Sequence, residues 1–144
     1  MRIFLAIAAL CAAVYAGFRA SLRLKRRAEL VRAMAADIAK LGTLMEYKRM
    51  PLAKLARSLS ESQLAGFWES FADALDRGED VAGAWSTTMD RAKDALDGFD
   101  ALTAEELRTI SDFGASLGMS ASSVQQANIA FAVKTLTGYA EALD

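Results

Sequence analysis

The feature that most constrains this chain is an uncharged stretch at its amino terminus. Residues 3–18, IFLAIAALCAAVYAGF, contain no charged side chain. As a helix rising about 1.5 Å per residue they would cover roughly 24 Å, a little less than the ~30 Å hydrocarbon core of a bilayer. Ala20 and Leu22 extend the apolar run if Arg19 and Arg23 reach back to the headgroups. We therefore expect a transmembrane anchor over residues 1–24. The large side chains expected to face lipid are Ile3, Phe4, Leu5, Leu10, Val14, Tyr15 and Phe18.

Basic residues are concentrated directly behind the apolar stretch, whereas only Arg2 and the terminal amine lie ahead of it. This basic collar consists of Arg19, Arg23, Lys25, Arg26 and Arg27. Because Lys and Arg accumulate on the cytoplasmic side of membrane helices, we expect the amino terminus outside and the rest of the chain in the cytoplasm. The same collar would be attracted to anionic lipid or to an acidic partner.

Two other interpretations of the stretch are a cleaved signal peptide and a lipoprotein anchor. A cleaved signal peptide would find a small-x-small site at Val14-Tyr15-Ala16, but the basic collar would then follow the cut directly. A lipoprotein anchor at Cys11 is disfavoured because bulky Leu10 precedes the cysteine. A retained anchor is preferred, and a secreted helical binding module released after Ala16 is the alternative.

Composition favours helices and argues against an enzyme. Alanine is abundant, proline occurs once and histidine never, so His-based metal sites, Ser-His-Asp triads and Cys-His pairs are excluded. Cys11 is the single cysteine, which rules out a disulfide within the chain. The acid pairs Glu79/Asp80 and Glu105/Glu106 stand at expected helix starts, where capping explains them. We expect no catalytic residue, no cofactor and no metal.

Apolar residues recur at spacings of three and four in six segments, which predicts helices. The segments are residues 22–47, 51–58, 60 or 62 to 77, 79–98, 103–118 and 120–143. In the first, the apolar stripe is Leu30, Met34, Ile38, Leu41 and Met45, and its charged residues, Asp37 among them, fall mostly on other faces. The sequence therefore predicts an all-α fold, in which the transmembrane helix is followed by a compact cytoplasmic bundle of about six helices over residues 25–144.

Several residues are expected to shape this bundle. Pro51 ends one helix and begins the next, while Gly78, Gly98 and Gly118 end later ones. Residues 103–106, TAEE, form a capping-box sequence. Trp85, Phe113 and Leu117 are expected in the core, and Gly114 is expected to allow a close helix–helix approach.

Charge is divided unevenly along the chain. Residues 1–57 carry twelve Lys and Arg against three acidic residues, whereas residues 58–144 carry five against fifteen. The acidic half predicts docking of a partner with a basic face, although solubility alone would also explain it. The residues expected to take part are Asp73, Asp76, Asp90, Asp94 and Asp97. Nucleic acid is not expected as a partner, because the basic region lacks interleaved aromatic residues and the rest of the chain is acidic.

A family resemblance runs through the chain. It is carried by Ala16-Gly17-Phe18, Met45-Glu46-Tyr47, Pro51-Leu52, Phe71, residues 81–85, residues 107–118 (LRTISDFGASLG) and Gln126. In their order and spacing these motifs resemble the stage III sporulation protein AB family. That family consists of membrane components of the sporulation channel between mother cell and forespore. It is similar to the cytoplasmic domain of platform proteins of type II secretion and type IV pilus machines.

The resemblance implies a structural, non-enzymatic assembly role on the mother-cell side of the membrane. Its expected partners are other channel components, including a secretion-type ATPase, and self-association is left open. Family members usually end in a second transmembrane helix. The sequence as given has no second apolar run, so either it is truncated or this member is anchored once.

Overall fold

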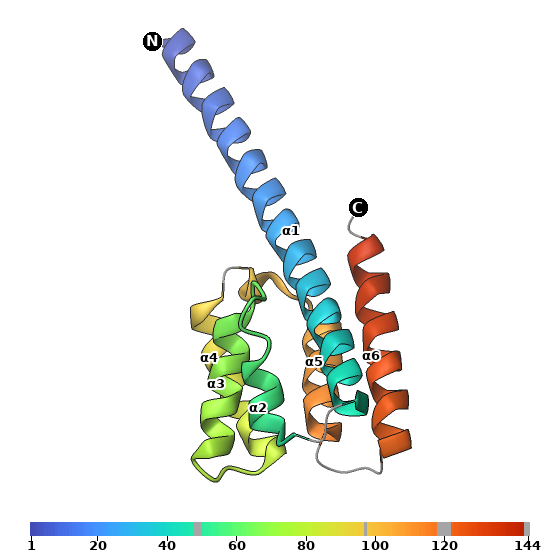
Figure 1. Cartoon of the computed structure of the whole chain (residues 1–144). Helices are drawn as coiled ribbons and strands as arrows, with labels where there is room; N and C mark the ends of the chain where they lie inside the picture. The colour runs from blue at the N-terminus through green and yellow to red at the C-terminus, as the bar shows by residue number, and fades with distance from the viewer. Residues whose placement is uncertain (48–49, 97, 118–121, 143–144) are drawn as a thin grey trace.

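The apolar stretch and the amphipathic segment behind it form one helix. In the computed structural model, which describes residues 1–47, 50–96, 98–117 and 122–142, α1 runs unbroken from Arg2 to Tyr47 (Figure 1). Its 46 residues extend about 69 Å at ~1.5 Å per residue. No helix break marks the boundary expected near residue 24, because the residues around it are good helix formers without proline.

The remaining elements are short helices, and the described residues contain no strand. They are α2 (Leu52–Arg57), α3 (Ala65–Asp76), α4 (Val81–Ala95), the 3-10 turn η1 (Phe99–Ala101), α5 (Ala104–Ser116) and α6 (Ser122–Ala142). The all-α prediction, an apolar amino-terminal helix followed by a helical bundle, is confirmed.

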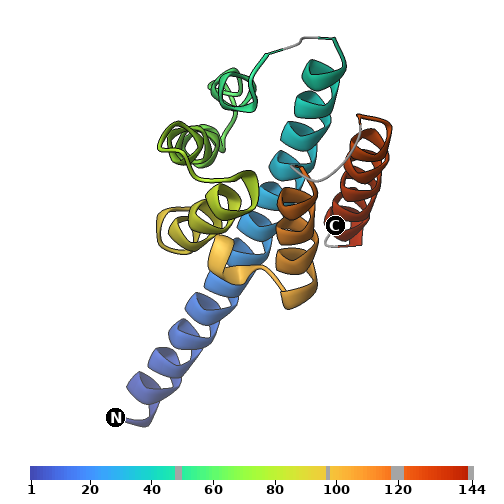
Figure 2. The same cartoon turned by 90° about the horizontal axis from the view of Figure 1, so that it is seen from below.

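The bundle has a ring-like arrangement. Each helix from α1 to α6 packs against the next in sequence, and α6 returns to lie along α1. Figures 1 and 2 show the consequence: only the carboxyl-terminal half of α1 belongs to the bundle, while its amino-terminal half projects beyond every other helix. η1 contacts α1 close to the point where the projecting half begins.

Proline and glycine lie at helix ends as predicted, but the structure differs from the prediction at two places. The carbonyl of Pro51 accepts from the amides of Lys54 and Leu55 at the start of α2. Gly78 and Gly98 have φ values of 89° and 86°, a left-handed conformation that glycine adopts without strain. α3 begins only at Ala65, later than predicted, and the end of α4 is followed by η1, which the sequence did not predict.

Side-chain caps begin α4 and α5. The Asp80 carboxylate accepts from the amide of Gly83 at 2.9 Å at the start of α4. At the start of α5, Thr103 Oγ1 accepts from the amide of Glu106 at 3.2 Å and Glu106 Oε1 accepts from the amide of Thr103 at 2.8 Å. This reciprocal pair confirms the predicted capping box.

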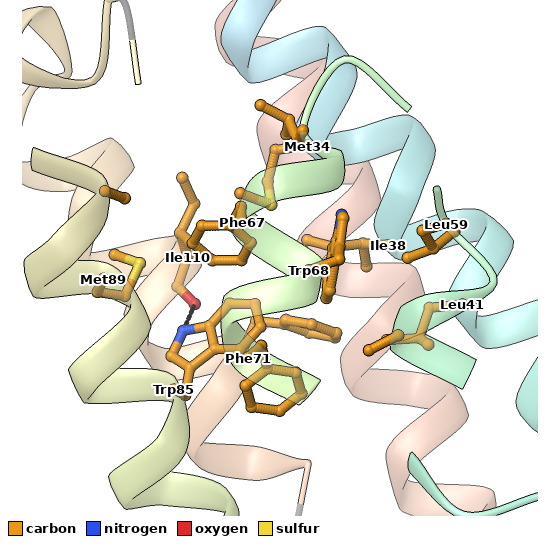
Figure 3. Packing of buried hydrophobic residues seen from close by; sticks show 14 of the residues in the cluster. Met34, Ile38, Leu41, Leu59, Phe67, Trp68, Phe71, Trp85, Met89 and Ile110 are labelled. Atoms are coloured by element: carbon orange, nitrogen blue, oxygen red, sulfur yellow. Dashed lines mark hydrogen bonds between the residues drawn. The ribbon is translucent and has the colours of Figure 1, made fainter. Parts of the chain in front are cut away.

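An aromatic cluster fills the centre of the bundle (Figure 3). Phe67, Trp68 and Phe71 of α3 surround Trp85 of α4, with ring centroids 5.2 to 5.7 Å from that of Trp85. Phe113 of α5 also packs against Trp85, with ring centroids 5.7 Å apart. All five side chains are buried, and the contacts of Phe67, Phe71 and Phe113 with Trp85 are edge-on, a favourable geometry for aromatic rings.

Gly114 makes room for the central tryptophan. A Cβ atom at position 114 would lie 2.0 Å from the Trp85 indole, whose Nε1 donates to the carbonyl of Ile110 at 3.0 Å. The close α4–α5 approach therefore depends on a side chain fitted over the glycine. Leu117, after α5, is buried in the same core, while Gly118 lies outside the described residues.

Asp37 is buried, contrary to the solvent-facing position expected from the sequence. Its carboxylate accepts from Trp68 Nε1 at 2.8 Å and from the hydroxyl of Ser62. Asp37 lies three residues after Met34 and four before Leu41, so it belongs to the buried stripe of α1. It is tolerated there because α3 and the segment before it supply the hydrogen bonds.

A second glycine sets the distance between α1 and α6. A Cβ at Gly42 would lie 2.8 Å from Cγ2 of Ile129, and Gln126 Nε2 donates to the carbonyl of Gly42 at 3.1 Å. On α6, Ile129, Leu136 and Ala140 are buried and form the seam of this helix.

Candidate membrane and partner interfaces

The projecting half of α1 exposes its apolar side chains. All seven residues expected to face lipid, from Ile3 to Phe18, are between 61% and 77% exposed. This segment has the length and composition of a membrane-spanning helix, and none of its most apolar window is buried in the bundle. Burial along α1 begins only at Ala28. An apolar surface of this size needs an apolar environment, so the segment is suited to membrane anchoring.

One member of the basic collar faces the bundle. Arg27 Nε donates to Glu106 Oε1 at 2.8 Å, and the Glu106 side chain is only 1% exposed. The same Oε1 accepts from the Thr103 amide, whereas the buried Oε2 has no hydrogen-bond partner among the described residues. Arg27 therefore locks α1 to the amino-terminal end of α5.

The other collar residues are exposed, and two of them make loose contacts. Arg23 Nη2 donates to the carbonyl of Asp100 at 3.4 Å and lies 4.0 Å from its carboxylate. The Arg19 guanidinium lies 5.8 Å from the ring centroid of Tyr15 one turn earlier. Lys25 and Arg26 are exposed on adjacent faces of α1. The collar thus combines one structural arginine with four residues available to a headgroup or partner.

Two of the five aspartates expected to bind a partner are occupied within the chain. Arg57 of α2 donates to Asp73 at 2.9 Å and to Asp76, both on α3. The hydrogen bonds that Arg57 donates to Asp76 and, with a smaller effect, to Asp73 raise the pKa of Arg57 above its usual value. These carboxylates brace α2 against α3.

The other acidic candidates lie on α4 and just beyond it. Asp90 is exposed and 3.7 Å from Lys93 one turn away, and Asp94 is exposed on the same helix. Asp97 lies outside the described residues. Of the five, Asp90 and Asp94 are therefore the described carboxylates best placed to meet a partner.

The described residues contain no cluster of three or more His, Cys, Asp or Glu side chains suited to binding a metal ion. The pockets formed by the described residues are grooves on the surface. The largest of them, of about 730 Å³, lies between α1 and η1 and is lined by collar arginines. Phe131 of α6 is 69% exposed and was not singled out in the sequence, since it falls outside the seam of that helix.

The comparisons with known proteins agree with this architecture. A family model described as stage III sporulation protein AB matches residues 2–143. The chain belongs to the stage III sporulation protein AB family. Membership of this family implies a role in sporulation.

A solved structure titled stage III sporulation protein AB (SpoIIIAB) has the same fold. It is 23% identical, and the match covers 83% of this chain and 94% of that chain with a TM-score of 0.74. A likeness at this identity shows the fold alone. No curated protein matches the chain.

The sequence missed three of the contacts that position α1. The sequence predicts a topological role for Arg27 and a capping role for Glu106, and nothing in it pairs residues 79 positions apart. Gly98 was expected to end a helix, but it also packs against the backbone of Arg26. Asp37 could have been found from its place in the apolar stripe.

Proposed function

We propose that this protein is a non-enzymatic assembly component of the channel between mother cell and forespore. α1 anchors it in the membrane, and the bundle lies in the mother-cell cytoplasm. The family supports a role in sporulation, and the basic collar behind the apolar segment supports this orientation.

The continuity of α1 is the observation that carries the proposal. The helix passes without a break from the apolar segment into the buried core, where Met34, Ile38 and Leu41 are fully buried. The ion pair between Glu106 and Arg27, the last residue of the collar, then fixes the bundle to the helix. A tethered enzyme needs only a flexible linker, whereas a rigid joint fixes the distance and orientation of the bundle relative to the membrane. That is a property of a structural component.

The expected partners are other channel components. On this proposal, Asp90 and Asp94 of α4 contribute to a face that docks a basic partner, of which a secretion-type ATPase is the leading candidate. Self-association of the chain in the membrane is a further way to assemble the channel.

Insertion of matched segments between Leu24 and Lys25 tests the role of the rigid joint. A seven-residue Gly/Ser insert should leave the anchor and the bundle intact but abolish their fixed relation. Seven helix-forming residues turn the helix by about 700°, within roughly 20° of two full turns, and so keep the orientation. We expect sporulation efficiency to fall far more with the flexible insert than with the helical one. Equal efficiencies with equal membrane levels would contradict a structural role for the joint.

Topology is tested separately. The mature chain should begin at residue 1 or 2 by mass spectrometry, and a carboxyl-terminal reporter should be active only in the cytoplasm. A mature chain beginning at Gly17 would instead support the secreted alternative.

A further inference from the structure

The groove between α1 and η1 has one wall made by a single face of α1. Its residues Tyr15, Phe18, Arg19, Leu22, Arg23 and Arg26 recur at intervals of three or four, and so lie along one side of the helix. The opposite wall is formed by Gly98 and Asp100. The groove has a volume of about 730 Å³.

Gly98 determines how closely the two walls approach. It adopts φ +86°, and a Cβ there would lie 3.1 Å from the carbonyl carbon of Arg26. The turn therefore packs directly on the α1 backbone, and Arg23 Nη2 adds a hydrogen bond to the Asp100 carbonyl. The groove is a consequence of the fold and not of one side-chain rotamer.

The chemistry of the groove suits a phosphate group. Three guanidinium groups line it against one carboxylate, and guanidinium forks match phosphate oxygens in pairs. The acid does not neutralise the site firmly, because the Arg23–Asp100 carboxylate contact is 4.0 Å long with side chains 64% and 72% exposed. Such an exposed pair contributes little and can give way to a better anion.

The position of the groove indicates where such a phosphate would come from. Arg19 is the first charge after the uncharged residues 3–18, so the upper part of the groove lies at headgroup depth if α1 crosses a bilayer. Phe18 and Leu22 are interleaved with the arginines along the same wall. A free phosphate ion gains nothing from contact with these apolar side chains, whereas the apolar part of a phospholipid can pack against them.

We propose that this groove binds the headgroup of an anionic phospholipid, with Arg19, Arg23 and Arg26 contacting the phosphate. Phe18 and Leu22 would then lie beside the glycerol and the first acyl carbons. The bound lipid would fill the space between α1 and η1 and hold the bundle against the membrane surface. The proposal rests on the anchoring part of the proposed function and is independent of channel assembly.

Lys25 provides a matched control for Arg26. The two residues are neighbours on α1 and carry the same charge at nearly the same depth, but only Arg26 lines the groove. General attraction to an anionic surface depends on the number of basic residues near the membrane and should treat them alike. A built site should distinguish them.

The test uses the full chain in nanodiscs of phosphatidylcholine containing phosphatidylglycerol, released for native mass spectrometry. We expect Arg26→Gln to reduce the retained phosphatidylglycerol by roughly fivefold or more, and Lys25→Gln to change it by less than about twofold. Arg19→Gln should act like Arg26→Gln, and Asp100→Asn should increase retention. Thermal melts of each variant show that the fold is intact.

The remaining outcomes are also decisive. Equal losses for Arg26→Gln and Lys25→Gln would reduce the effect to general surface attraction and overturn the site. Displacement of the lipid by millimolar inorganic phosphate would assign the groove to the free ion instead. If α1 were no membrane anchor, the wild-type chain would fail to enter nanodiscs of any composition. Failure of the anchor is therefore distinguishable from failure of the site.

Discussion

At Gly114 the packing of the bundle depends on the absence of one carbon atom. The indole of Trp85 occupies the space that a Cβ would fill, and its ring contacts aromatic residues of α3 and α5. Gly66 is a helical glycine of the opposite kind, with nothing within 4 Å of its Cβ position. Substitutions at these two positions therefore distinguish the steric role of a glycine from its effect on backbone entropy.

We expect Gly114→Ala to destabilise the protein by about 1–3 kcal/mol, because the buried indole must shift in a packed core. Gly66→Ala should instead stabilise it by roughly 0.4–1 kcal/mol, since alanine restricts the unfolded chain. Thermal or urea unfolding of the full chain in detergent measures both. Unchanged stability of Gly114→Ala would mean that Trp85 has room to move.

Arg27 differs from its neighbours in the collar because its partner is buried. We expect Arg27→Met to cost about 3 kcal/mol, since it leaves the Glu106 carboxylate buried without its cation. Lys25→Met is the control and should stay within about 0.5 kcal/mol of wild type. Similar unfolding midpoints for the two variants would show that the ion pair is dispensable for stability.

At the scale of elements, α1 combines two helices that the sequence suggested separately. The apolar run and the amphipathic stripe are each recognisable in the sequence. Spacing, Pro51 and the Thr103 capping box predict the later helices, apart from the late start of α3 and the turn η1. The continuity of these two segments of α1 in one helix is not predicted. A membrane anchor and a soluble helix have different apolar patterns, and the sequence shows only that no helix breaker separates them. The contacts that orient α1, Gly42 with Ile129 and Arg27 with Glu106, link distant parts of the chain and leave no local signal.

The α1–α6 contact gives an element-scale prediction. Gly42→Leu should push α6 away from α1 and cost about 1–3 kcal/mol, and Ile129→Ala in the same chain should recover part of that loss. Gly138→Ala, on α6 with nothing within 4 Å of its Cβ position, serves as control. Hydrogen exchange of α6 amides, together with urea unfolding, follows the displacement. A double variant less stable than the sum of the single changes would contradict direct contact as the cause.

On the scale of the whole molecule, the basic and acidic halves of the sequence partly neutralise each other within the fold. Arg23, Arg27 and Arg57 of the basic half each meet a carboxylate of the acidic half. Asp90 and Asp94 of α4 remain exposed, and Asp90 lies 3.7 Å from Lys93 of the same helix. Solubility accounts for an exposed acid anywhere, whereas a docking face requires that particular acids matter more than others.

The proposed docking face therefore predicts a difference between acids of equal charge. Asp90→Asn with Asp94→Asn should lower the association rate with a basic channel partner by roughly three- to tenfold at low salt, and the difference should vanish near 1 M salt as the Debye length falls to ~3 Å. Glu105→Gln with Asp112→Asn removes the same charge from exposed positions on α5 and should slow association less. Asp73→Asn with Asp76→Asn should instead loosen the contact between α2 and α3, which unfolding experiments would detect.

Stopped-flow or surface-plasmon kinetics with the purified ATPase candidate compare the association rates of the three variant pairs. Equal slowing by the α4 and α5 pairs would mean that association depends only on the overall negative charge of the acidic half and not on a docking face. An association rate that does not change with salt would contradict electrostatic docking altogether.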